Sequence, residues 1–166
     1  MRPGSNTRKA IEIVNRELRE SDTEFEFIDL ADLTLLHPGG TGESSDMEAV
    51  REMVRNSRGL ILSTPEYHGS FSAALKLFIE NLDFPSVLKG KPVALLGVAA
   101  GVIGAIKSLE HLRSVCSHVG CLVLPEPVSI AGVRNVFDDA GNCLDEKLEA
   151  RVRGLASKLT DFAVEK

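Results

Sequence analysis

Three short segments contain the residues best suited to holding a ligand. The first, residues 2–7, offers the guanidinium of Arg2, the hydroxyls of Ser5 and Thr7 and the amide of Asn6 just before a helical pattern begins. Backbone N–H groups at the start of a helix lack intrahelical partners and carry a partial positive charge. This set of donors suits a phosphate group, although Ser5 or Asn6 would equally serve as a simple helix cap.

The second and third segments, residues 64–70 and 99–104, each follow an apolar, strand-like run. The second contains the only tyrosine, Tyr67, with Pro65 and Gly69, and its rigid backbone suits a planar ring. It is equally consistent with a tight turn between a strand and a helix. The third contains only Ala, Gly, Val and Ile, and its small residues let backbone approach a ligand closely.

Residues 99–104 also resemble a dinucleotide-binding fingerprint with alanine in the first glycine position. Glu126 follows about 20 residues later, where that motif places an acidic residue. Because the first glycine is missing and the unit comes late in the chain, we favour the simpler interpretation of a small-residue loop.

A second alternative is a metal site, since two histidines and two cysteines occur close together: His111, Cys116, His118 and Cys121. Their spacings match no standard zinc pattern. We therefore interpret them as residues of a helix surface and assign no metal ligand.

Alternating helix-like and strand-like patterns position the three segments. Apolar residues recur at helical spacing from residue 6 to 20 and from residue 145 onward, and Ser45 with Glu48 forms a capping box. Further helices are predicted over 71–82 and 104–118, and strands over 25–30, 59–63, 93–98 and 121–124. Strands that are apolar throughout are typical of a parallel sheet covered by helices on both faces. The sequence thus predicts one α/β domain, residues 1–166, with a doubly wound parallel sheet in a three-layer α/β/α arrangement and ligands at the carboxyl ends of its strands.

Composition narrows the class of partner. The 166 residues carry a formal net charge of -5, which gives no electrostatic help in approaching nucleic acid or anionic lipid. The longest uncharged apolar run, residues 93–106, is shorter than the ~20 residues that cross a bilayer. No targeting segment is recognisable, and three cysteines without CxxC spacing do not predict a secreted disulfide framework. We expect a cytoplasmic protein with no nucleic-acid or membrane partner.

The three segments together resemble the flavin loops of the NADPH-dependent FMN reductase family, whose fold is flavodoxin-like. The matching stretches are residues 2–8 (RPGSNTR), 65–70 (PEYHGS) and 97–101 (GVAAG), and the resemblance extends over nearly the whole chain. Family members begin with an apolar strand ending in Gly-Ser, whereas Met1 directly precedes Arg2 here. The usual first strand is therefore expected to be missing from the sheet. His68 stands where the family usually has asparagine.

The resemblance implies FMN as cofactor and NADPH as co-substrate. By resemblance, the FMN phosphate is held by Arg2, Ser5, Asn6 and Thr7, the isoalloxazine ring is bordered by Pro65, Glu66, Tyr67 and His68, and its other edge is faced by Ala99, Ala100 and Gly101. NADPH would pass hydride to the flavin, which would then reduce a small acceptor such as a quinone, an azo compound, free flavin or a metal oxyanion. This chemistry belongs to the cofactor, so no side chain is assigned as catalytic.

The family also implies a homodimer or homotetramer, with Phe78 and Phe84 as candidate interface residues. Two other functions remain open at this point. A flavodoxin-like electron carrier would bind FMN without oxidising NADPH, and a flavin-free remnant or interaction protein would be colourless. Visible absorbance and NADPH oxidation separate these three classes.

Overall fold

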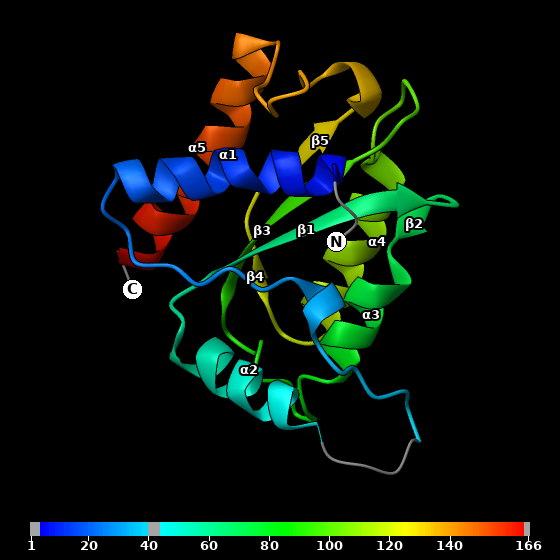
Figure 1. Ribbon diagram of the computed structural model, residues 1–166. Coiled ribbons are helices and arrows are strands. Elements are labelled where there is room, and N and C mark those ends of the chain that lie inside the picture. The colour runs from blue at the N-terminus through cyan, green and yellow to red at the C-terminus, as the bar shows by residue number, and fades with distance from the viewer. Residues whose placement is uncertain (1–3, 40–43, 165–166) are drawn as a thin grey trace.

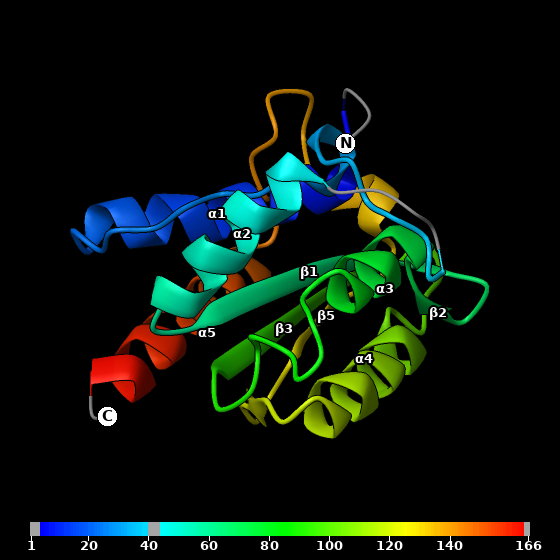
Figure 2. The same cartoon turned by 90° about the horizontal axis from the view of Figure 1, so that it is seen from below.

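Helices cover both faces of a central sheet in this computed structural model, which describes residues 4–39 and 44–164 (Figure 1). One face carries α1 (Asn6–Glu20) and α5 (Glu146–Val164). The other face carries α2 (Ser45–Asn56), α3 (Ala73–Glu80) and α4 (Ile106–His118). Figure 2 shows the sheet running between α1 and α4. The predicted three-layer α/β/α architecture is therefore confirmed.

The centre of the sheet is a parallel pair, β1 (Leu60–Tyr67) and β3 (Pro92–Val98), joined from Leu60↔Val93 to Pro65↔Val98. Two short strands follow one another along the far edge of β3. They are β4 (Leu122–Val123), which pairs at its start, and β5 (Val128–Ile130), which pairs at its end. Pro125 and Pro127 lie between them and cannot donate to a ladder, which explains why this edge strand is broken. The predicted strand over 121–124 was therefore only its first part.

The alternation of side chains along β3 divides the apolar core into two clusters. Ala94, Leu96 and Val98 pack with α1 and α5, whereas Val93 and Leu95 pack with α2, α3 and α4. All seven residues of β3 are buried, as expected for a strand between two helical layers.

The close approach of α4 to the sheet depends on Gly97. A Cβ at Gly97 would lie 2.7 Å from the Cβ of Ala105 and 2.9 Å from the Cγ of Leu109. Both contacts are too short to be tolerated without movement of the helix. This glycine therefore sets how near the start of α4 lies to the carboxyl end of β3.

Helix boundaries agree closely with the sequence patterns, and α1 begins and ends where it was predicted. The capping box was placed one residue too late. Ser44 is the N-cap of α2 and its Oγ accepts from the Met47 N–H at 3.3 Å, while Glu48 pairs with Arg51 instead of reaching back to the cap.

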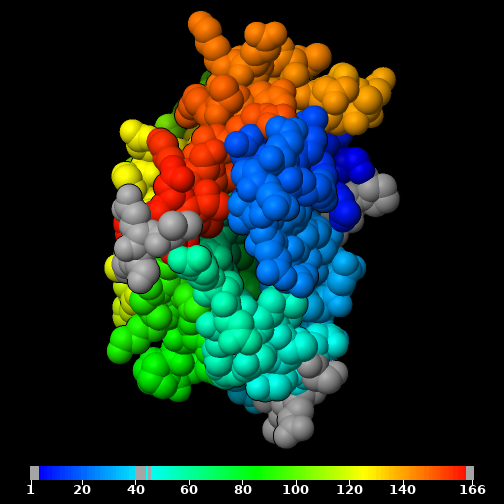
Figure 3. All heavy atoms as spheres, turned by 90° about the vertical axis from the view of Figure 1, so that its left-hand side faces the viewer, coloured from blue at the N-terminus to red at the C-terminus, as the bar shows by residue number. Residues whose placement is uncertain are grey.

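The predicted strand over residues 25–30 is wrong. This segment is extended but belongs to no sheet, and it leads into a short 3-10 helix, η1 (Leu30–Asp32). In the strand order β2-β1-β3-β4, the edge of β1 away from β3 is paired only at Glu66 and Tyr67, by β2. Within the described residues, no strand lies beside residues 25–30 for them to pair with. Figure 3 shows a hollow on this side of the molecule, bounded by α1, α5 and the chain from α2 into β1. That the family's usual first strand is missing stays a prediction.

Candidate functional site

The carboxyl end of β1 closes into a two-residue hairpin with β2 (Ser70–Phe71). Tyr67 pairs with Ser70, so His68 and Gly69 form the turn, with φ of 50° and 75°. Hairpin turns of type I′ require positive φ at both central residues. Glycine adopts this conformation freely, and histidine is among the residues enriched there. The predicted loop over 64–70 is therefore strand up to Tyr67 followed by a tight turn.

Glu66 connects this hairpin to the first turn of α4. Its Oε2 accepts from the backbone N–H of Ser108 at 3.2 Å. The N-cap position of α4 is Ala105, whose side chain has no oxygen to offer. A carboxylate from β1 thus takes the place of a local cap, and its charge is favourable beside the positive end of the helix.

A second link joins the same two elements. The Nδ1 of His111 on α4 lies 3.1 Å from the Oγ of Ser70 in the hairpin. The hairpin formed by β1 and β2 is therefore joined to α4 by two hydrogen bonds. One links Glu66 to the backbone of Ser108, and the other links Ser70 to His111.

The loop over residues 99–104 is attached to β5. Ser129 Oγ accepts from the Ala105 N–H at 2.8 Å, and a Cβ at Gly104 would lie 2.5 Å from that oxygen. Gly104 also has a φ of +79°, so both the conformation and the space demand glycine. Backbone bonds from Ala99 to Ile130 and from Gly132 to Gly101, of 2.9 and 3.0 Å, hold the remainder of the loop.

The predicted site residues of the first segment lie at the start of α1, except Arg2, which falls outside the described residues. Ser5 is the N-cap, and its Oγ accepts from the Arg8 N–H at 3.4 Å. Asn6 is half-buried and Thr7 is buried. The N–H groups of the first helical turn have no intrahelical partner.

Figure 1 shows the start of α1, the carboxyl end of β1 and the loop after β3 on the same side of the molecule. Tyr67, Val102 and Ile103 expose their apolar surface there. The described residues predicted for the site therefore share one edge of the sheet. What the sequence did not indicate are the two groups that hold the site, the backbone N–H of Ser108 and the hydroxyl of Ser129, because neither residue stands in a motif.

The two alternative interpretations find no support at this edge. Glu126 forms an ion pair with Lys158 of α5. Within residues 4–39 and 44–164, no group of three or more His, Cys, Asp or Glu side chains is placed to share a metal ion. His111 and His118 are exposed as predicted, but Cys116 and Cys121 are buried, so their interpretation as surface residues was wrong.

The donors at this edge fit a flavin mononucleotide. A Cβ at Gly4 or at Gly101 would meet nothing within 4 Å, so the backbone of both segments is open to a ligand. Backbone N–H groups at the start of a helix such as α1, together with a hydroxyl such as that of Ser5, suit a phosphate. The backbone of residues 65–68 and 99–101 would border the planar ring.

Comparison with known proteins first defines the class. The flavoenzyme NAD(P)H:(acceptor) oxidoreductase FerB from Paracoccus denitrificans superposes with a TM-score of 0.80 at 22% identity, covering 99% of this chain and 93% of that one. The fold is therefore that of the flavodoxin-like proteins, and a solved archaeal flavodoxin also matches it with a TM-score of 0.67 at 10% identity, covering 99% of this chain and 94% of that one.

Sequence comparison then defines the family. The model of the NADPH-dependent FMN reductases matches residues 1–135, and the chain belongs to this family. A 2-hydroxy-1,4-benzoquinone reductase from Burkholderia sp is 30% identical over 134 residues, which cover 78% of this chain and 73% of that protein. An FMN-dependent NADPH-azoreductase from Staphylococcus aureus (strain USA300) is 28% identical over 167 residues, covering 95% and 88%.

Family membership confirms the predicted class of enzyme. The protein is an NAD(P)H-dependent oxidoreductase with FMN as its cofactor and NADPH as its reductant. Across the described residues, none of the helices has the length and hydropathy needed to cross a bilayer.

Proposed function

We propose that this enzyme transfers reducing equivalents from NADPH to a small conjugated acceptor, a quinone or an azo compound, with FMN held at the carboxyl edge of the sheet. The observation that supports the site best is the cross-linking of its segments: Glu66 caps α4, and Ser129 bonds the N-cap residue Ala105. Two of the sheet's carboxyl-end loops are thereby held in fixed relation. The quinone reductase and the azoreductase among the relatives support the class of acceptor.

Each segment has a distinct role in this proposal. Ser5, Asn6 and Thr7 bind the phosphate through the start of α1, joined by Arg2. The backbone from Pro65 to His68 forms one wall for the ring, and Ala99, Ala100 and Gly101 form the other. The flavin supplies the hydride and electron chemistry when bound. The chain's own groups bind it, orient it and shield one side with Tyr67 and Val102, which are largely exposed without it.

Reconstitution tests this proposal directly. The purified protein is mixed with excess FMN, passed through a gel-filtration column and examined for flavin absorbance, then assayed for NADPH oxidation with a quinone acceptor. Riboflavin, which lacks the phosphate, is the matched control ligand. Retained FMN with weaker riboflavin binding and acceptor-dependent turnover is expected. A colourless, inactive protein would overturn the proposal.

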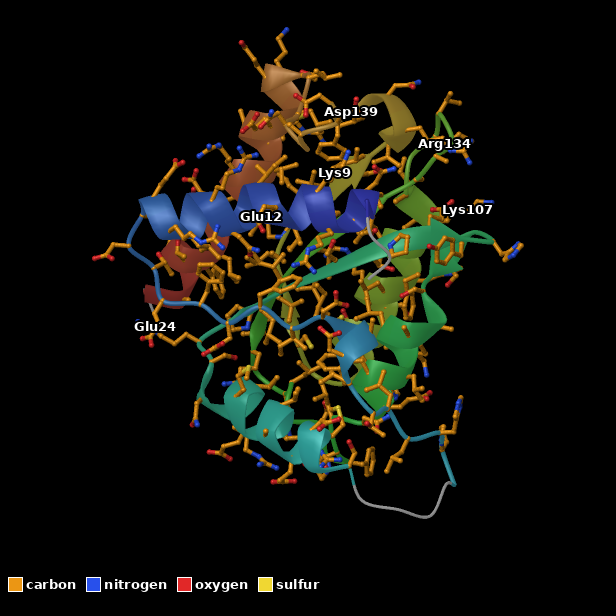
Figure 4. All side chains as sticks on the ribbon, in the orientation of Figure 1. Lys9, Glu12, Glu24, Lys107, Arg134 and Asp139 are labelled. Atoms are coloured by element: carbon orange, nitrogen blue, oxygen red, sulfur yellow. The ribbon has the colours of Figure 1, made fainter. Side chains whose placement is uncertain are left out.

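We further propose that Lys107 and Arg134 bind the 2′-phosphate that distinguishes NADPH from NADH. Lys107 lies in the first turn of α4, and Arg134 lies in a 3-10 helix, η2 (Val133–Asn135), bonded to the loop after β3. Figure 4 shows both side chains on the side of the molecule where β1 ends. Within the described part of the chain, neither makes an ion pair or side-chain hydrogen bond, whereas most other arginines pair with carboxylates. Both cations lie beside the segments proposed to hold the flavin, Lys107 next to Gly69 and Arg134 next to Val133, whose N–H donates to Ala99 O.

Charge reversal tests this assignment. Lys107→Glu and Arg134→Glu should each raise the KM for NADPH by about tenfold, on the order of 1.4 kcal/mol, and leave the KM for NADH nearly unchanged. Lys147→Glu is the matched control, because Lys147 is an exposed cation at the start of α5. Equal loss with both nucleotides would contradict the role of the 2′-phosphate.

We propose that the enzyme is a homodimer formed through the face around Phe84. The ring of Phe84 is 98% exposed and borders a groove of about 990 Å³ with Pro38, Val115 and His118. Aromatic residues are enriched at protein–protein interfaces, so an exposed ring beside a groove supports an interface at this face. Phe78, the other predicted interface residue, is buried in the core and is excluded from this role.

Light scattering at micromolar concentration should give the mass of two chains. Phe84→Ser should shift it to one, whereas Phe27→Ser, at a less exposed aromatic ring beside Arg8, should not. A wild-type monomer would contradict the proposal.

We also propose that residues 1–166 act as one domain and that the enzyme works in the cytoplasm, which cell fractionation would test.

A further inference from the structure

The C-terminus of α4 is a Schellman motif that brings two cysteines together. Val119 is the C-cap and Gly120, with a φ of +87°, follows it. The Gly120 N–H donates to Ser117 O at 3.1 Å and the Cys121 N–H donates to Cys116 O at 2.9 Å, which are the two bonds of this motif. The motif usually places an apolar contact between the residues at these two outer positions. Here both are cysteine.

The backbone distance permits a covalent bond between them. The 2.9 Å hydrogen bond joins the Cys121 nitrogen, about 1.46 Å from its own Cα, to the Cys116 oxygen, about 2.4 Å from its own Cα. The two Cα atoms therefore lie at most ~6.8 Å apart, within the range observed for disulfides. The two thiols lie close enough to shift each other's pKa in opposite directions, so the two side chains face each other across the turn.

The two sulfurs are not equivalent. Cys116 is fully buried, and its hydrogen bond to Cys121 together with burial raises its pKa. The same interaction lowers the pKa of Cys121, which is also buried but keeps 8% of its surface exposed, against 0% for Cys116. Since the thiolate is the reactive form, Cys121 is the better nucleophile of the two.

We propose that Cys121 and Cys116 form a reversible, peroxide-responsive disulfide. The Cys121 thiolate attacks hydrogen peroxide, the O–O bond breaks and hydroxide leaves, which gives a sulfenic acid on Cys121. The Cys116 sulfur then attacks the Cys121 sulfur. The S–O bond breaks, its oxygen leaves as water with the Cys116 proton, and two electrons have passed from the dithiol to the peroxide. Reversible disulfides of this kind are compatible with a reducing compartment.

This inference is independent of the flavin site. The cysteines lie at the last turn of α4, whereas the segments proposed to hold FMN meet its first turn. The third cysteine, Cys143, provides a matched comparison, since it is half-exposed and its Sγ donates to Asp145 O.

The test uses the full FMN-loaded chain, as wild type and as Cys143→Ala. Each is treated with hydrogen peroxide, denatured, alkylated at its free thiols and digested with trypsin. Cys116 and Cys121 fall in one tryptic peptide, residues 114–134, because no Lys or Arg separates them. After peroxide treatment we expect this peptide to carry no alkyl groups and to be lighter by two hydrogen atoms than the unalkylated dithiol peptide. Reduction with dithiothreitol before alkylation should restore the dialkylated mass.

Single variants assign the order of attack. Cys116→Ala should leave a sulfenic acid on Cys121 that dimedone traps, and Cys121→Ala should leave Cys116 as an unmodified thiol. Trapping on Cys116 in place of Cys121 would overturn the proposed order. If the 114–134 peptide of the Cys143→Ala protein keeps both alkyl groups at peroxide concentrations that oxidise Cys143 in the wild type, the proposal is wrong.

Discussion

The ring half and the phosphate half of the candidate flavin site are held in different ways. The ring half depends on contacts between elements far apart in sequence, Glu66 with Ser108 and Ser129 with Ala105. The phosphate half, in its described part, is the start of one helix whose cap, Ser5, bonds a residue three positions away. One half forms only when the sheet and α4 assemble, whereas the other needs little more than α1.

This difference predicts how each half responds to mutation. Damage to the ring half should lower stability and flavin affinity together, because the same hydrogen bonds maintain the helix start and the ring walls. Damage to the phosphate half should affect affinity for FMN more than for riboflavin. Four substitutions test this contrast.

Gly104→Ala should have the largest effect. Its methyl group would lie 2.5 Å from Ser129 Oγ in a backbone of positive φ, which we expect to cost about 2–3 kcal/mol of unfolding free energy. FMN affinity should fall as well. Gly101→Ala is the matched control, because its Cβ meets nothing within 4 Å, and it should keep parental stability while weakening FMN binding. Chemical denaturation and flavin titration check both. Parental stability of Gly104→Ala would show that the close contact between Gly104 and Ser129 does not hold the ring half together.

Glu66→Ala should come next. Because the side chain caps α4, a loss of about 1–2 kcal/mol in stability is expected. FMN affinity should fall by about tenfold or more, on the order of 1.4 kcal/mol. Tyr67→Ala, at the exposed neighbouring residue, should lower affinity or activity by a similar factor without changing the melting temperature. If both variants melt and bind FMN like the parent, the hairpin is not a flavin wall.

Ser5→Ala tests the phosphate half and should cost less. The 3.4 Å bond from Arg8 to Ser5 is long, so we expect about 0.5–1 kcal/mol of stability. FMN affinity should fall severalfold and riboflavin affinity should not change, as two parallel titrations would reveal. Equal losses for the two ligands would show that Ser5 does not act on the phosphate.

His68→Asn should have the smallest effect. Asparagine is favoured in hairpin turns with positive φ, so stability should rise by a few tenths of a kcal/mol. Comparison of flavin affinity between the two proteins shows whether the family's usual residue at this position contributes to binding. A clear loss of stability would contradict the assignment of the turn.

Local patterns predicted most of the regular structure. The helical spacing of α1 gave its bounds, and the fully apolar run over 93–98 identified the central strand β3. The errors in the strands all depend on pairing. Residues 25–30 carry a strand-like pattern without a partner, and β2 and β5 are two and three residues long, too short for any periodicity.

The sequence by itself determined the alternation of helices and strands, the three segments predicted to bind a ligand and the family, because these follow from side-chain type and spacing along the chain. Only the tertiary structure decided which groups hold those segments. Glu66 caps a helix that begins 40 residues further along, and Cys116 meets Cys121 across a turn. Such contacts depend on strand register and on how closely α4 approaches the sheet, and neither is encoded in the local spacing of residues.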